Sequence, residues 1–246
     1  MSDTITGPAP GGQQTARIIA VQPREIKEAA SRSLCAAGAD PLEAQEGALA
    51  VLRAEAEAHA GLRLLEDLLN ADWTTAARPT AAKDASWVGG TLRELACAGQ
   101  PALRTALQLL DLAADAPDGE VSVTRTSQAR IPSLLWNDLV LRRTATLGRR
   151  IIIATTHAGA APGPEDTTNY LTVRDGVLSA TPILAPEAAA ALIPQTMEHG
   201  TVVVVLPEPV HTSPETTNIP PKALNMREKD WQNMYQMSRK YLVPDA

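Results

Sequence analysis

The sequence predicts an α/β fold in which an N-terminal helical hairpin packs on a mixed sheet with a βαβ unit, and a C-terminal helix follows. Three patterns carry this prediction. Apolar residues recur at helical spacing in the N-terminal part, short unbroken apolar runs such as Ile151–Ala154 and Val202–Leu206 follow after residue 120, and an amphipathic stretch lies near the end. With 246 residues and 44% hydrophobic residues, the chain can bury the core of one large domain.

The N-terminal part predicts two helices. The first begins at Pro23 and ends before Gly38, with an apolar stripe at 3.6-residue spacing. Asp40 caps the second, with proline at its first position and glutamate at its third. Its apolar positions continue to Leu69, so we expect one uninterrupted helix and a helical hairpin within residues 17–73.

Strands and helices alternate after the hairpin. A strand at 121–124, a helix at Ser133–Leu147 ended by Gly148, and a strand at Ile151–Ala154 have the order of a βαβ unit. The other expected elements are a loop at Thr74–Lys83 leading to a turn at Gly89-Gly90, a helix at Pro101–Ala114, a hairpin of strands 171–173 and 177–180, a helix at Glu187–Met197, a strand at Val202–Leu206 and a final helix at Met226–Tyr241.

We expect one folded unit. Residues 1–16 are predicted to form a flexible tail, and residues 17–246 a single α/β domain. Its parts are the helical hairpin (17–73), the sheet-containing core (85–206), a proline-rich connector (207–224) and a segment with the C-terminal helix (225–246).

Charge and composition exclude several classes of function. The net charge of -6 disfavours binding to nucleic acid or to an anionic membrane. No apolar run reaches the ~20 residues that a membrane-spanning helix needs, and the N-terminus does not have the pattern of a secretory signal, so we expect a cytoplasmic protein. The two cysteines are isolated and no two of the four histidines lie within four residues, so the sequence predicts no metal site.

His59 and Arg63 form the most informative pair of candidate site residues. They are four residues apart in a predicted helix, which would place both side chains on one face. A guanidinium can hold a carboxylate while an imidazole exchanges a proton with a neighbouring oxygen, which suits a small hydroxy or keto acid. In the alternative interpretation, Arg63 is a solvated surface residue and His59 is hydrogen-bonded and partly buried.

Other polar groups have open interpretations. His157 follows a predicted buried strand and could line a ligand site at its carboxyl end, or belong to a polar loop that leaves the sheet. Two arginine pairs, 142–143 and 149–150, could meet an anion or be solvated at a helix end. The acidic residues Glu55, Glu57, Glu66 and Asp67 are expected on a solvated helix face.

The order of several motifs resembles the non-Rossmann malate/L-lactate dehydrogenase family, which includes ureidoglycolate dehydrogenases and cyclic-imine reductases. Ala58-His59-Ala60-Gly61-Leu62-Arg63-Leu64 resembles its Ser-His-Gly-x-x-Arg-Leu motif, and Gly99-Gln100 resembles its Gly-Gln segment. The strand at 121–124 leading to Ser127 resembles the strand before its Asn-Ser-x-His-Phe-Gly loop. The likeness covers about the first 156 residues, and the chain is also similar to an uncharacterised bacterial domain family.

The resemblance implies a homodimeric oxidoreductase that uses NAD or NADP to reduce a small 2-keto acid or cyclic imine. It assigns His59 as the catalytic proton donor and Arg63 as the residue that binds the substrate carboxylate, with Ser127 as a further substrate-binding candidate beside His157. The loop after Ser127 contains no histidine, and no Gly-Thr-Asn-Pro segment is present to hold the nicotinamide, so the cofactor-binding residues are unknown. The alternative is a non-catalytic binding module or one subunit of a larger hetero-oligomeric bacterial enzyme.

Overall fold

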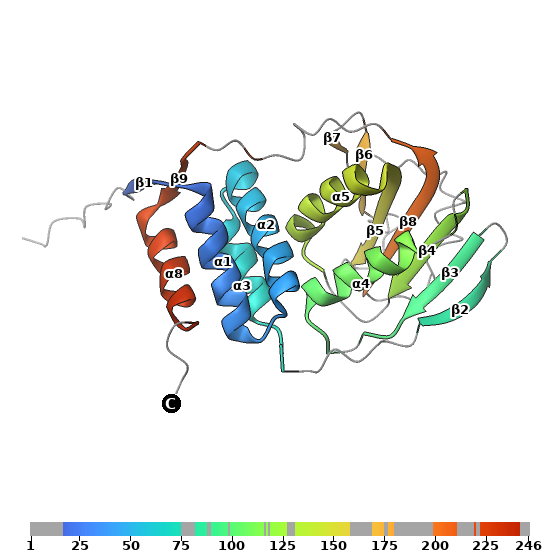
Figure 1. Cartoon of the computed structure of the whole chain (residues 1–246), viewed down its shortest axis with the longest axis horizontal. Coiled ribbons are helices and arrows are strands. Elements are labelled where there is room, and N and C mark those ends of the chain that lie inside the picture. Colours follow the sequence, from blue (N-terminus) through green and yellow to red (C-terminus); the bar gives the residue numbers. More distant parts are fainter. Residues whose placement is uncertain are drawn as a thin grey trace, which may run out of the picture.

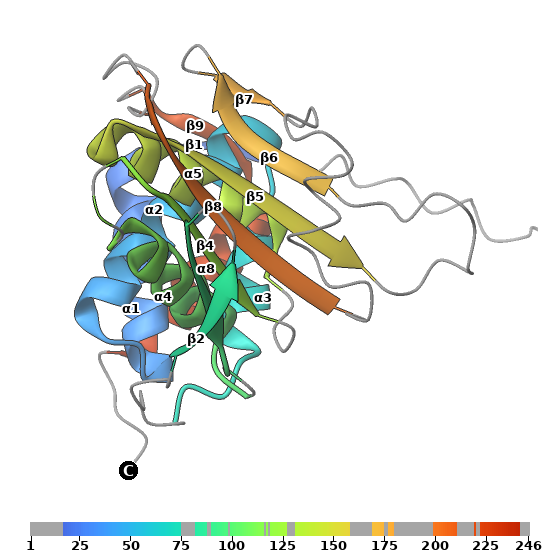
Figure 2. The same ribbon diagram turned by 90° about the vertical axis from the view of Figure 1, so that its right-hand side faces the viewer.

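Helices stack on one side of a mixed β-sheet (Figures 1 and 2). The computed structural model describes residues 17–74, 82–87, 90–97, 99–115, 117, 119–126, 131–157, 169–174, 177–179, 199–210, 219 and 222–241. This arrangement confirms the predicted α/β class. The predicted tail at 1–16, the helix at 187–197 and most of the proline-rich connector lie outside the described residues.

Four helices form the layer farther from the sheet: α1 (Pro23–Ala37), α2 (Pro41–Ala58), α3 (Gly61–Leu69) and α8 (Glu228–Arg239). The caps of α1 and α2 are as predicted. Gly38 ends α1 with a left-handed φ of 111°, and the Asp40 carboxylate accepts a hydrogen bond from the backbone N–H of Leu42 at 2.9 Å. None of the helices in the described part of the chain is long and apolar enough to cross a membrane.

The sheet has seven strands in the order β2-β3-β4-β8-β5-β6-β7. Helix α4 (Ala102–Ala114) connects the parallel neighbours β3 and β4, which makes a βαβ unit, and the other neighbouring strands of the described sheet pair antiparallel. The strands are β2 (Ala82–Trp87), β3 (Gly90–Leu95), β4 (Val121–Thr126), β5 (Arg149–His157), β6 (Asn169–Arg174), β7 (Val177–Ser179) and β8 (His199–Pro209).

The predicted unit of strand, helix and strand is present, but its two strands are not adjacent in the sheet. Helix α5 (Ser133–Leu147) ends at Gly148, as expected, and leads from β4 to β5. These two strands are not neighbours, because β8 lies between them and pairs antiparallel with both. The valine run of β8 pairs with both strands. Val205 is the register partner of Ser122 in β4 on one side and of Ile151 in β5 on the other.

The structure corrects several predicted boundaries. Strands β2 and β3 begin at Ala82 and Gly90, where we expected a loop and a turn. Strand β2 lies at the edge of the sheet, and its polar sequence has no apolar pattern by which a strand could be recognised. The valine-rich strand continues through Pro209 into the predicted connector, across a bulge opposite Arg149. Met226 belongs not to the last helix but to β9 (Leu224–Arg227), which pairs with β1 (Ile18–Val21).

The central strands β4, β5 and β8 are buried on both faces of the sheet, as the unbroken apolar runs of β5 and β8 predicted. On β5, Ile151 and Ile153 face the helices and belong to the main core, whereas Ile152 faces the opposite side with Val123 and Val204. Helices α4 and α5 cover the first face and separate it from α1, α2 and α3 (Figure 1). The main core therefore runs from the sheet through two helical layers.

A charged cluster crosses the contact between α2 and α5. Asp138 of α5 has a side chain only 1% exposed, and its two carboxylate oxygens accept hydrogen bonds from Arg53 Nε at 2.9 Å and Arg142 Nε at 2.7 Å. The arginines continue outward to Glu57 at 2.8 Å and Glu46 at 2.6 Å. Burial opposes the charge of Arg142, but its carboxylate partners outweigh burial and raise its pKa.

Removing the Asp138 carboxylate should strongly destabilise the protein. The variant Asp138→Ala leaves Arg53 and Arg142 without their shared partner inside the helical layers, and we expect it to lower the free energy of unfolding by roughly 3–5 kcal/mol in urea titrations. Glu57→Ala is the control, because this partner of Arg53 is 46% exposed and should cost less than about 1 kcal/mol. Equal losses in the two variants would contradict the central role of Asp138.

Candidate functional site

The predicted continuous helix is interrupted at His59. Helix α2 ends at Ala58, His59 adopts a left-handed conformation with φ 50° and ψ 39°, and α3 begins at Gly61. The expectation that His59 and Arg63 share the face of one helix is therefore wrong: His59 is the C-cap of α2, and Arg63 lies in the first turn of α3. The two residues flank a corner between the helices.

Glu55 holds this corner together. Its side chain is 6% exposed, and Oε2 accepts a hydrogen bond from the backbone N–H of Gly61 at 3.0 Å. Its other oxygen, Oε1, is 3.7 Å from Nδ1 of His59. The prediction of a solvated Glu55 is wrong because the helix break turns this carboxylate inward to satisfy a free N–H group at the start of α3.

Gly61 allows the close approach of the two helices. A Cβ atom at this position would lie 2.8 Å from Cβ of Glu55 and 2.9 Å from the carbonyl oxygen of Val51. Both distances are shorter than ordinary contacts, so a side chain at position 61 would push α3 away from α2. The glycine thus fixes the distance between Glu55 and the N-terminus of α3.

The corner presents His59 to solvent. The His59 side chain is 75% exposed, and Arg63 is also exposed. In the described part of the chain, no hydrogen bond or ion pair joins the side chains of His59 and Arg63. Glu55 lies on the Nδ1 side of the imidazole, so the other ring nitrogen is left to exchange a proton with a bound molecule, while Arg63 can attract a carboxylate. The cavities found between α1, α2 and α5 do not include His59 or Arg63.

The remaining candidates are only partly placed. Ser127 lies outside the described residues. His157 is the last residue of β5, and its register partner is His199 at the start of β8, so the backbone brings two histidines to one end of the sheet. Nothing in the described backbone or side chains joins this end to the His59 corner. Sequence reasoning missed Glu55, whose one available signal was its position four residues before a histidine.

The described residues contain no cluster of three or more ligands that could hold a metal ion. Cys97 is buried, with Sγ 2.9 Å from the hydroxyl of Thr126. Cys35 is half-buried, and burial raises the pKa of its thiol, which disfavours the reactive thiolate form. Cys97 belongs to the main core, and Cys35 packs against it.

Comparisons with known proteins show the fold. A dehydrogenase from Sinorhizobium meliloti superposes with a TM-score of 0.55 and 13% identity, over 90% of this chain and 100% of that chain. A malate dehydrogenase from Entamoeba histolytica gives a TM-score of 0.52 and 10% identity, over 93% of this chain and 99% of that chain. No protein-family model and no curated protein matches the sequence. The chain therefore has the fold of these dehydrogenases, which confirms the resemblance at the level of structure.

Replacing His59 by glycine should not destabilise the protein. Glycine adopts a positive φ without steric cost, so we expect His59→Gly to leave the free energy of unfolding unchanged or to raise it by up to about 1 kcal/mol. Ala58→Gly is the matched control one residue earlier, at the last helical residue of α2, where glycine should cost up to about 1 kcal/mol. Chemical denaturation measures both. A larger loss for His59→Gly than for Ala58→Gly would mean that the histidine is a structural residue.

Adding a methyl group at Gly61 should be costly. Because the new Cβ would meet Glu55 and the backbone of Val51, we expect Gly61→Ala to lower the free energy of unfolding by roughly 1–3 kcal/mol. Glu66→Ala, on the exposed face of the same helix, should change it by less than about 0.5 kcal/mol. Thermal and urea denaturation of both variants check this, and an unchanged Gly61→Ala protein would contradict the tight packing of the corner.

Proposed function

We propose that this chain is an oxidoreductase that uses NAD or NADP to reduce a small 2-keto acid or cyclic imine, with His59 as the proton donor. One observation carries the proposal: the Glu55 and His59 pair lies at a corner between two helices of a fold that known dehydrogenases share. The left-handed conformation of His59 adds support, because strained backbone at a non-glycine residue is common at functional sites.

The chemistry assigned to these residues is a proton transfer. Reduction of a keto or imine carbon leaves negative charge on the attached oxygen or nitrogen, and a protonated His59 neutralises that charge by donating its proton. Glu55, 3.7 Å from Nδ1, orients the ring so that the opposite nitrogen faces the substrate. Solvent then returns the proton, since the side chain is 75% exposed. Arg63 binds the carboxylate of the substrate through paired N–H groups.

NAD or NADP would supply the hydride when bound. The residues described around His59 do not form a platform for a nicotinamide ring: the imidazole is exposed, and the carboxylate of Glu55 beside it would repel the pyrophosphate. We therefore assign no cofactor-binding residue among them. A second copy of the chain, or another subunit, is proposed to cover the corner and complete the site.

The second candidate function is a non-catalytic binding module or a subunit of a larger enzyme. The observation that favours it is the exposure of both His59 and Arg63, since enzymes that transfer hydride exclude water from the reacting atoms. In this alternative, the corner binds a small carboxylate or contacts a partner, and no cofactor is used. The two candidates differ in whether the purified chain binds a nicotinamide cofactor.

The test is binding of NADH and NADPH to the purified protein by calorimetry, followed by turnover with pyruvate, oxaloacetate and a cyclic imino acid. If the chain is a reductase, His59→Gln should lower kcat by about 10²–10⁴-fold. Arg63→Gln should mainly raise KM, because it removes binding to the substrate carboxylate. The control Glu66→Gln should behave as the unaltered protein. Absence of binding by both cofactors would reject the reductase and leave the binding module.

A further inference from the structure

A cavity of about 410 Å³ lies between the beginning of α1, the middle of α2 and the middle of α5. It belongs to the part of the molecule that holds the Asp138 cluster, and the α2–α3 corner does not contribute to it. Its volume is in the range of sites that bind small molecules. The proposed reductase activity does not use this cavity, so a ligand bound here would be independent of that activity.

The inner wall of the cavity is made of charged side chains that are largely buried. Arg53 and Arg142 line it on either side of Asp138, and the Arg53 side chain is only 5% exposed. Their outer carboxylate partners, Glu57 and Glu46, do not line the cavity. Each guanidinium is paired with Asp138 and with its own glutamate, so this wall offers hydrogen-bonding groups but no net positive charge, and the cation that attracts an anion has to come from the rim.

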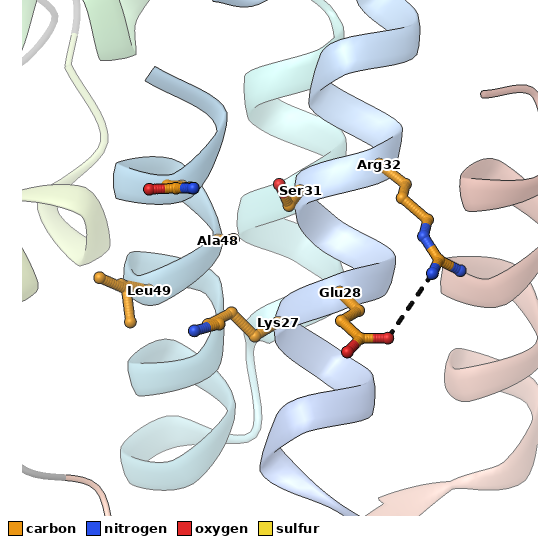
Figure 3. Close-up of a pocket in the computed structure, with 7 residues that line it drawn as sticks. Lys27, Glu28, Ser31, Arg32, Ala48 and Leu49 are labelled. Atoms are coloured by element: carbon orange, nitrogen blue, oxygen red, sulfur yellow. Dashed lines mark ion pairs between the residues drawn. The ribbon is translucent and has the colours of Figure 1, made fainter. Parts of the chain in front are cut away.

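The rim adds two more cations. Arg24 is hydrogen-bonded to Glu28 at 2.6 Å, which lowers the pKa of Glu28 and neutralises this arginine. Lys27 differs, because within the described part of the chain no carboxylate lies within ion-pair distance of its amino group. Figure 3 shows Lys27 reaching from α1 toward α2, whereas Glu28 and Arg32 point away to pair with each other at 3.6 Å.

Lys27 stands where two cavities meet. A second cavity of about 310 Å³ continues along α1 and α2, and Lys27 and Leu49 line both spaces. The larger cavity also has an apolar side formed by Leu49, Leu52 and Ile219. A ligand in it would meet aliphatic carbon on one side and an ammonium group without a carboxylate partner at the mouth.

We propose that this cavity binds a small organic anion with a short aliphatic body, the carboxylate at Lys27 and the body against Leu49, Leu52 and Ile219. Charge selects the anionic group at Lys27, because Arg24, Arg53 and Arg142 are each paired with a carboxylate, whereas no carboxylate of the described residues lies within ion-pair distance of Lys27. The apolar side adds affinity by removing aliphatic surface from water. Inorganic anions lack the body and neutral alcohols lack the charge, so both should bind more weakly.

Hexanoate is the probe, titrated into the full chain at low salt without NADH or NADPH and followed by calorimetry and by chemical shifts. We expect acetate, inorganic phosphate and hexan-1-ol each to bind at least about tenfold more weakly than hexanoate. Added salt should weaken the binding of hexanoate more than that of hexan-1-ol. Equal binding of phosphate or of the alcohol would overturn the proposed ligand class, and no binding of hexanoate would overturn the site.

Two variants test the location. Lys27→Met keeps a long apolar side chain without the ammonium group, and it should weaken hexanoate about tenfold while leaving hexan-1-ol unchanged. Leu49→Trp should fill the space and abolish the binding of both probes. Lys240→Met, at the exposed end of α8, is the matched control and should bind as the unaltered protein. Unchanged binding by Lys27→Met would overturn the assignment, and circular dichroism verifies that each variant is folded.

Discussion

The Asp138 carboxylate, shared by Arg53 and Arg142, is the interaction on which the arrangement of the helical layers depends. Apolar packing between α2 and α5 is non-directional and would tolerate a shift of one helix along the other. The charged cluster does not, because two of its bonds cross between the helices: Arg53 of α2 donates to Asp138 of α5, and Arg142 of α5 donates to Glu46 of α2. Arg142 also donates to Asp138 within α5 and so holds the carboxylate in place. Arg53, Asp138 and Arg142 also form the inner wall of the cavity between α1, α2 and α5. One buried cluster therefore both positions the helices and shapes the proposed binding surface.

The α2–α3 corner shows a similar double use of one carboxylate. Glu55 satisfies the N–H of Gly61 and at the same time lies beside His59, so the structure of the corner and the orientation of its imidazole are linked. A histidine in the left-handed region contributes nothing that a glycine would not provide to the backbone. Its chemistry, rather than its conformation, is the physical reason for a histidine at this position in the proposed function.

Sequence reasoning predicted the elements whose signals are local. Asp40 and Gly148 mark helix ends, and the valine run of β8 marks a strand buried on both faces; all three are confirmed. It missed β2, whose polar residues suit an edge strand, and β1 with β9, which depend on a distant partner. The break at His59 was hidden because alanine and glutamate around it favour helix. The inward positions of Glu55 and Arg142 depend on tertiary neighbours that one sequence does not reveal.

The pairing of β1 with β9 has a consequence for how the molecule is made. Ile18 and Arg227 are register partners although more than two hundred residues separate them in the chain. During synthesis, α1 emerges from the ribosome long before α8, whose fully buried Met234 completes the main core. The face of α1 that α8 covers must therefore stay uncovered until α8 has been synthesised, and closure of the helical layer becomes a late step governed by this very long-range contact.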